Sequence, residues 1–121
     1  MAKILIVDDS PTELHVLQKI LVKNGHEVLV ADSGEAGIAK AKANLPDLVL
    51  MDVVMPGMNG FQATRQLTSH SETANIPVII VTTKDQETDK VWAKRQGARD
   101  YLVKPVEEKG LIEHVNMVLS S

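Results

Sequence analysis

Apolar residues gather in five short runs along the chain, and longer segments with a three-to-four-residue apolar repeat separate them. Most runs are continuous and rich in Val, Ile and Leu, which is typical of strands buried on both faces of a parallel sheet. The pattern therefore predicts five parallel strands. They are expected at Lys3–Val7, Val28–Ala31, Leu48–Met51, Val78–Val81 and Tyr101–Val103.

The intervening segments have the length and periodicity of amphipathic helices. The first has a well-marked start, because Ser10 can cap it, Pro11 suits the first helical position and Glu13 would complete a capping box. The fourth has a thin apolar stripe, mainly Val91 and Trp92, so we expect it to be weakly anchored. The expected helices are Pro11–Asn24, Glu35–Asn44, Gly60–His70, Gln86–Gln96 and Lys109–Leu119.

Alternation of strands and helices indicates an α/β fold, a (βα)5 doubly wound parallel five-stranded sheet with helices on both faces. A chain of 121 residues can bury one hydrophobic core, so we expect residues 1–121 to form a single domain without an output domain. In such sheets ligands bind beyond the carboxyl ends of the strands. Candidate chemistry is therefore sought at that edge.

Composition narrows the classes of protein that fit this fold. Cysteine is absent, which excludes disulfides and thiolate chemistry and suits a reducing compartment. No apolar run has the length of a membrane span and the first ten residues lack a signal-peptide pattern, so we expect a cytoplasmic protein without membrane insertion. A net charge of −3, no basic stripe and only three aromatic residues argue against nucleic-acid binding.

Polar residues follow four of the predicted strands. Each has an ordinary structural explanation: acids at a helix start, a carboxylate at a strand end, a β-branched strand residue, or a solvated lysine in a turn. Together, however, clustered carboxylates repel one another and favour a bound cation, and oxygen ligands suit Mg²⁺ or Mn²⁺. The residues are Asp8, Asp9, Asp52, Thr82, Thr83 and Lys104.

A carboxylate beside such a metal can attack phosphorus and form an aspartyl phosphate. That reaction requires neutralisation of the phosphoryl oxygens, which a lysine, a hydroxyl group and a metal can supply. Other sites on this topology fit less well. The segment VDDSPT lacks the glycines of dinucleotide-binding and P-loop motifs, its two aspartates would repel a flavin phosphate, and the D-x-D motif of haloacid-type phosphatases is absent.

At this point the chain resembles the response-regulator receiver domain, the CheY-like family, over its whole length. The resemblance lies in DD at 8–9, MDVVMPGMNG at 51–60, VTT at 81–83 and DYLVKP at 100–105. It implies a flavodoxin-like sheet with strand order 2-1-3-4-5. It also implies a signalling domain that catalyses only its own phosphotransfer and slow dephosphorylation, rather than a classical enzyme.

The resemblance assigns a role to each residue of the predicted site. Asp52 corresponds to the phosphoacceptor. Asp9 corresponds to the acid that binds Mg²⁺ directly together with Asp52, and Asp8 to the acid that helps to hold it. Val54 corresponds to the position whose backbone carbonyl completes this metal site. Thr82 and Lys104 correspond to the hydroxyl and the amine that contact the phosphoryl group.

Further residues match positions that shape the site or change conformation. Tyr101 corresponds to an aromatic switch that turns inward as Thr82 moves; the alternative is a half-buried residue at the sheet edge. The resemblance implies a cis peptide between Lys104 and Pro105, and Pro56 and Gly60 match residues that shape the loop after the phosphoacceptor.

Two positions near the site depart from common family choices. Val54 stands where the family often has a polar residue that orients a hydrolytic water, and Thr83 where a smaller residue is usual. The valine side chain cannot form a hydrogen bond, so the rate of self-dephosphorylation is expected to depend on this position. The extra methyl group of Thr83 is expected to narrow access to the phosphoryl group.

A narrower resemblance, to PilH-type regulators of type IV pilus twitching motility, lies in GFQATRQLT and in IPVIIVTTKDQETDKVWAKRQGARDYLVKP. It implies a stand-alone, monomeric response regulator, a CheA-like histidine kinase as phosphodonor and a downstream motility or pilus protein. Two alternatives are a phosphorylation-independent binding module with the same fold and a phosphate sink for a shared kinase. Trp92 either contacts a partner or packs against the domain.

The acidic balance of the chain fits a local site. The sequence has 16 acidic and 13 basic residues, and setting aside Asp8, Asp9 and Asp52 leaves 13 of each. We therefore expect a nearly neutral domain with one concentrated acidic pocket, suited to a divalent cation.

Overall fold

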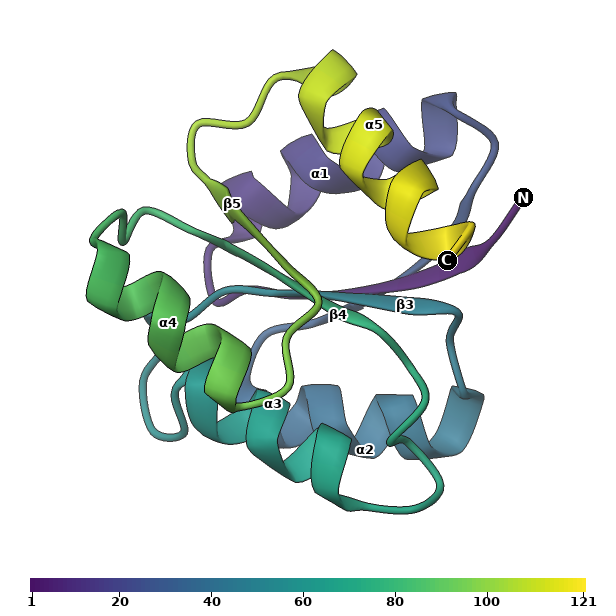
Figure 1. Ribbon diagram of the computed structural model, residues 1–121. Coiled ribbons are helices and arrows are strands. Elements are labelled where there is room, and N and C mark those ends of the chain that lie inside the picture. The colour runs from purple at the N-terminus through teal and green to yellow at the C-terminus, as the bar shows by residue number, and fades with distance from the viewer.

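The computed structural model describes residues 1–121 and contains five strands that alternate with five helices (Figure 1). None of the helices combines the length and the apolar character needed to span a membrane. The elements are β1 (Lys3–Val7), α1 (Pro11–Lys23), β2 (Glu27–Ala31), α2 (Gly34–Asn44), β3 (Leu48–Met51), α3 (Gly60–Ser69), β4 (Val78–Thr82), α4 (Glu87–Arg95), β5 (Asp100–Val103) and α5 (Glu108–Leu119).

The five strands form one parallel sheet in the order β2-β1-β3-β4-β5. This order confirms the predicted doubly wound topology. β1 lies between β2 and β3, and Ile6 is in register with Val30 on one side and Leu50 on the other. The direction in which strands are added reverses at β1. The chain passes from β1 to β2 on one side, and then crosses from β2 to β3 on the other side of β1. The carboxyl ends of β1 and β3 therefore lie side by side.

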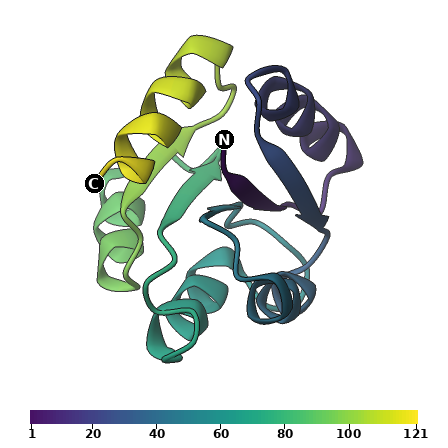
Figure 2. The ribbon, with the colours of Figure 1, turned by 90° about the vertical axis from the view of Figure 1, so that its right-hand side faces the viewer.

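The sheet separates two helical layers (Figures 1 and 2). Helices α1 and α5 cover one face, and α2, α3 and α4 cover the other. Successive residues of β1 alternate between these layers: Leu5 and Val7 join the core beneath α2–α4, whereas Ile4 and Ile6 join the core beneath α1 and α5. Because both faces are buried, the central strands read as continuous apolar runs.

Three strands extend beyond the apolar runs that predict them. β2 begins at Glu27, β4 ends at Thr82 and β5 begins at Asp100. Each added polar residue is paired in the sheet, as shown by the registers Lys3↔Glu27, Thr82↔Val103 and Ile79↔Asp100. Backbone hydrogen bonding therefore carries these strands past the point where hydrophobicity stops.

The start of α1 differs from the predicted capping box. The Ser10 Oγ accepts a hydrogen bond from the Glu13 amide at 3.3 Å, as expected of an N-cap. The Ser10 amide, however, donates to Oδ1 of Asp8 at 2.9 Å instead of to the Glu13 carboxylate. The box is therefore half formed, because Asp8 already occupies the donor that Glu13 would satisfy.

Helix α4 is anchored by a different residue from those predicted. Val91 and Trp92 are 48% and 49% exposed, and Ala93 is the buried residue of this helix. The predicted apolar stripe was therefore wrong, because this short helix turns its small alanine towards the sheet. One buried methyl group is a slight anchor, which agrees with the expectation of weak attachment.

Candidate functional site

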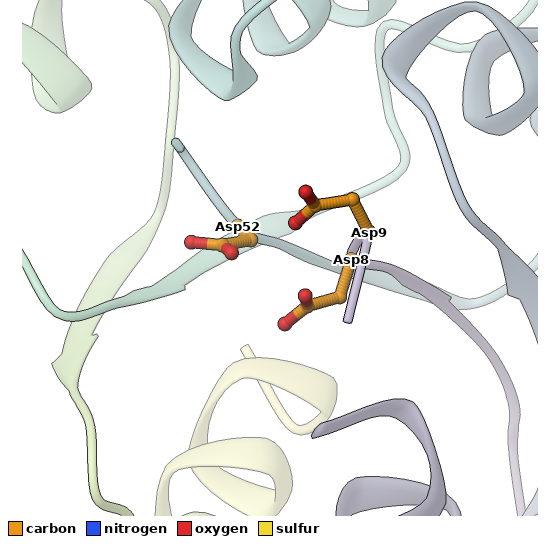
Figure 3. Close-up of side chains that lie close together, drawn as sticks. All are labelled: Asp8, Asp9 and Asp52. Carbon is orange, nitrogen blue, oxygen red and sulfur yellow. The ribbon is translucent and has the colours of Figure 1, made fainter. Parts of the chain in front are cut away.

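Three carboxylates meet at the carboxyl edge of the sheet (Figure 3). One oxygen from each of Asp8, Asp9 and Asp52 lies within 4.8 Å of the others. Sheet hydrogen bonding continues past the strands to place two of them, because the Asp8 amide donates to Ala31 and the Asp52 amide to Val7. Asp8 and Asp52 are buried, whereas Asp9 is exposed.

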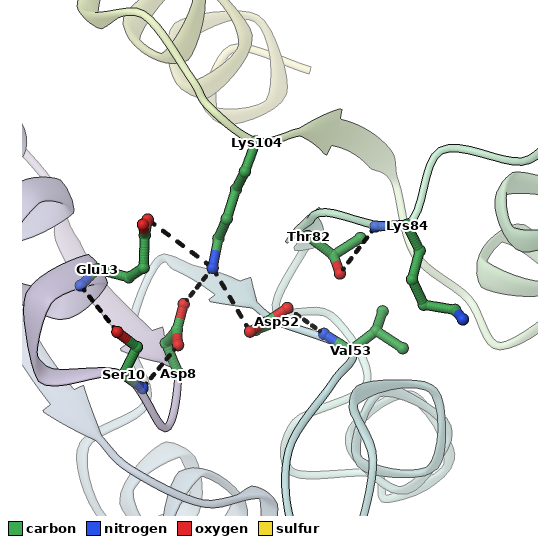
Figure 4. A network of polar contacts seen from close by, with 8 residues as sticks. All are labelled: Asp8, Ser10, Glu13, Asp52, Val53, Thr82, Lys84 and Lys104. Atoms are coloured by element: carbon green, nitrogen blue, oxygen red, sulfur yellow. Dashed lines mark hydrogen bonds and ion pairs between the residues drawn. The ribbon is translucent and has the colours of Figure 1, made fainter.

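Lys104 brings a positive charge to these carboxylates from the end of β5 (Figure 4). Its amide donates to the Thr82 carbonyl at 2.8 Å, which fixes the backbone beside β4. Its Nζ lies 2.6 Å from Oδ2 of Asp8 and 3.5 Å from Oδ2 of Asp52. The lysine side chain is only 8% exposed, so these ion pairs are shielded from water.

The pKa values of this group follow from burial and charge. Burial raises the pKa of Asp52, the Lys104 charge opposes this effect, and the Asp8 charge adds to it, so the net shift is upward. Burial by itself would lower the pKa of Lys104, but its hydrogen bond to Asp8 and the surrounding carboxylates outweigh burial and raise it. Lys104 is therefore charged at neutral pH, when it faces carboxylates that outnumber it.

The donor set fits a hard divalent cation. All three side chains offer oxygen ligands, and one ammonium group does not balance three ionised carboxylates. Asp9 makes no hydrogen bond or ion pair within the protein, so its carboxylate is available as a ligand. By contrast, both oxygens of Asp8 have partners in the protein, Ser10 and Lys104.

Two hydrogen bonds of the Lys84 backbone connect the acidic edge to β5, one with Thr82 and one with Tyr101. The buried Thr82 hydroxyl accepts a long hydrogen bond from the Lys84 amide at 3.4 Å, and the Tyr101 hydroxyl donates to the Lys84 carbonyl at 2.7 Å. The tyrosine ring is partly buried at the sheet edge. Burial, with the charges of Asp89 and Asp85 nearby, raises the pKa of Tyr101 to about 12.

The backbone directly after β3 lies close to the N-terminal end of α3. A Cβ atom added to Gly60 would lie 1.9 Å from the Asp52 carbonyl oxygen and 2.8 Å from the Val53 Cα, so only glycine fits here. The Gly60 amide also donates to the Val53 carbonyl at 3.0 Å. Pro56 is exposed in this loop. Gly60 therefore lets the helix pack directly against the backbone of Asp52.

The remaining predicted residues lie around this edge. Val54 is 58% exposed, and Thr83 is also exposed. The peptide between Lys104 and Pro105 is cis, as the resemblance implies. The two departures from common family choices are thus exposed to solvent and do not belong to either hydrophobic core.

The sequence reasoning missed Glu13 as a neighbour of the site. Its Oε1 lies 3.9 Å from Nζ of Lys104, on the opposite side of the ammonium group from Asp52 (Figure 4). The sequence predicts instead that Glu13 caps its own helix. The only available signal was its place in the first turn of α1, which begins at the same sheet edge.

Comparison with known proteins identifies the class to which this fold and this edge belong. The response regulator receiver domain matches residues 4–116, and the chain belongs to that family. Within the family, the chain is 67% identical over 120 residues to protein PilH of Pseudomonas aeruginosa, covering 99% of both proteins. The predicted resemblance to PilH-type regulators is confirmed.

Solved structures confirm the CheY-like fold. The chemotaxis protein CheY4 of Vibrio cholerae is 33% identical, with a TM-score of 0.93 over 98% of each chain. The receiver domain of the sensor histidine kinase PA1611 from Pseudomonas aeruginosa is 27% identical, with a TM-score of 0.92 over 99% of this chain and 98% of that one. That structure has a magnesium ion coordinated in its active-site cleft.

Proposed function

We propose that this receiver domain is a phosphorylation-dependent response regulator in which Asp52 accepts a phosphoryl group from a histidine kinase. The arrangement of Asp52, Asp8 and the buried Lys104 supports the proposal. A carboxylate with raised pKa lies 3.5 Å from an ammonium group that can neutralise phosphoryl oxygens. An ordinary aspartate at a strand end is solvated and does not require a buried lysine, such as Lys104 after β5, to balance its charge.

We further propose that Mg²⁺ or Mn²⁺ occupies the acidic edge. Asp9 and Asp52 would bind it directly, Asp8 would help to hold it, and the backbone carbonyl of Val54 would complete the ligand set. When bound, the metal would neutralise charge on the phosphoryl oxygens. The oxygen-only donor set and the magnesium ion in the PA1611 receiver domain support this assignment.

The proposed step is an exchange of one bond at phosphorus. An Asp52 carboxylate oxygen forms a bond to phosphorus while the bond from phosphorus to the donor histidine nitrogen breaks, and that nitrogen keeps the electron pair. The Lys104 ammonium group would stabilise the phosphoryl oxygens, and the Thr82 hydroxyl would donate a hydrogen bond to one of them. Burial of Asp52 limits the water around the acceptor oxygen.

Phosphorylation would then be transmitted to β5 through the backbone of one residue, Lys84. The phosphoryl group carries about −1.5 to −2 charges in place of the single charge of the Asp52 carboxylate, and its oxygens draw Thr82 towards them. Thr82 and Tyr101 are both hydrogen-bonded to the Lys84 backbone, so movement of the threonine alters the support of the ring. We propose that α4, β5 and α5 form the surface that a partner reads.

The 67% sequence identity to PilH, together with the resemblance to PilH-type regulators of twitching, supports a role in motility. We propose a cytoplasmic, monomeric regulator with a CheA-like kinase as phosphodonor and a type IV pilus output. Deletion in the host, followed by complementation with the wild type or with Asp52→Ala, should restore surface twitching only with the wild type. Equal rescue by both versions would favour the phosphorylation-independent module. Restoration of another regulator's phosphorylation level without a direct pilus partner would favour the phosphate sink.

The chemical step can be tested on the purified protein. Incubation with acetyl phosphate and Mg²⁺ should add one phosphoryl group to the intact mass, and Asp52→Asn should abolish the adduct. Asp47→Asn is the matched control, because this exposed aspartate lies outside the acidic edge and accepts a hydrogen bond from the Lys3 amide, which asparagine can also do. An adduct that persists in Asp52→Asn would refute the assignment of the phosphoacceptor.

A further inference from the structure

We infer that Glu13 is a positioning residue that draws the Lys104 ammonium group towards α1 and so restrains its pull on a phosphoryl group at Asp52. The inference rests on the proposed function. Glu13 Oε1 and Asp52 Oδ2 lie on opposite sides of the Lys104 Nζ, at 3.9 Å and 3.5 Å (Figure 4). The two carboxylates therefore compete for one cation.

Glu13 can take this role because the N-cap amide that a capping-box glutamate normally accepts from already has another acceptor. In an S-x-x-E capping box the glutamate accepts a hydrogen bond from the N-cap amide. Here the Ser10 amide donates to Oδ1 of Asp8, and Oδ2 of the same aspartate binds Lys104. Asp8 thus replaces Glu13 at the helix start and holds the lysine close enough for Glu13 to attract it.

The contact is electrostatic rather than a hydrogen bond. A separation of 3.9 Å is too long for a hydrogen bond, and the glutamate side chain is 40% exposed, so the attraction is partly screened by solvent. Lys104 is nevertheless only 8% exposed, so water screens its charge little. A small displacement of its Nζ therefore changes its interaction with Asp52.

The first test observes Lys104 directly in the metal-free, unphosphorylated protein. In ¹⁵N-lysine-labelled protein, with the side-chain resonance assigned through Lys104→Arg, Glu13→Gln and Glu13→Asp should both shift the Lys104 Nζ signal. The aspartate keeps the charge but is one methylene too short to maintain the contact. Glu27→Gln, at the opposite sheet edge, should leave the signal in place. An unchanged signal in either Glu13 variant would overturn the inference.

The second test measures phosphorylation by acetyl phosphate in the presence of Mg²⁺. Both Glu13 variants should be phosphorylated about two- to fivefold faster than the wild type, the range expected for loss of an ion pair that solvent partly screens. The ratio should fall as salt is added. A wild-type rate in Glu13→Asp would show that only the long-range charge matters. An equal increase in Glu27→Gln would show that net charge alone is responsible. Either result overturns the positioning role.

The two tests separate this inference from the proposed function. If the wild-type protein forms no adduct, the proposed function is refuted together with the effect on the phosphoryl group. The lysine spectrum still decides, in that case, whether Glu13 holds Lys104. Because the Glu13 side chain is partly exposed and packs into neither hydrophobic core, both of its variants are expected to fold.

Discussion

Single side chains set the chemistry of the pocket, and Val54 is the most informative of them. It lies beside the proposed phosphoacceptor and is 58% exposed, so a polar substitute can reach water without disturbing the core. We predict that Val54→Asn will hydrolyse its aspartyl phosphate several-fold faster than the wild type, because an amide can orient the attacking water. Decay of the phosphorylated mass after removal of the phosphodonor measures this rate.

The unfolding free energy of Val54→Asn should differ from that of the wild type by no more than about 0.5 kcal/mol, as is usual for an exposed position. A change in phosphoryl lifetime without a change in stability would locate the effect at the site. Equal lifetimes in the two proteins would contradict the prediction.

Tyr101 offers a prediction that needs no phosphorylation. Its pKa is raised from 10.0 to about 12, chiefly by burial and then by the charges of Asp89 and Asp85. It is the single tyrosine in the sequence, so the ultraviolet absorbance of tyrosinate reports this group alone. Titration of the folded protein should show the transition near pH 12, and the urea-unfolded chain should titrate near its ordinary value. Coincident transitions would refute the raised value.

At the scale of elements, the junction between β3 and α3 depends on Gly60. A methyl group there would collide with backbone atoms of Asp52 and Val53, which cannot rotate away as a side chain can. We predict that Gly60→Ala will lower the unfolding free energy by about 2 kcal/mol, within the range for overpacked sites. Urea unfolding followed by circular dichroism gives the measurement.

Gly110→Ala is the natural control for this substitution. Gly110 lies in α5, and a Cβ atom added there would meet nothing within 4 Å. Alanine is the better helix former, so this variant should be up to about 1 kcal/mol more stable than the wild type. Losses of similar size at both positions would show that the close approach at Gly60 is not the cause.

Much of the element pattern was predictable because hydrophobic periodicity and sheet burial carry the same information. The central strands were expected within a residue of their observed ends, and the convergence of Asp8 and Asp52 followed from the shared direction of parallel strands. Residues whose placement depends on a partner far along the chain were not predictable. Glu13 lies near Lys104, and Ala93 rather than Trp92 is the buried residue of α4. Both placements depend on how distant parts of the chain pack together.

At the scale of the whole molecule, pH-dependent stability includes a contribution from His26. Burial, together with the positive charge of the N-terminal amine, lowers its pKa below the ordinary 6.5. The unfolded chain therefore takes up a proton first as the pH falls. The stabilisation is complete above pH 6.5, declines as the pH falls through 6.5 towards the lower folded value, and then levels off.

We predict that His26→Gln will lose less stability than the wild type between neutral pH and about pH 5. The difference should be a few tenths of a kcal/mol, because the histidine is largely solvent-screened. Urea unfolding at several pH values tests this, and comparison of the two proteins cancels the contributions of all other titrating groups. Parallel pH profiles would contradict the prediction.

The sheet gives this small molecule two interiors that share no residue. Leu5 and Ile6 are neighbours in the chain, yet one packs beneath α2–α4 and the other beneath α1 and α5. Substitutions in opposite interiors should therefore have additive effects on the free energy of unfolding. The effects of two substitutions within one interior should not be additive. Substitutions confined to one interior should therefore leave the packing of the other interior intact.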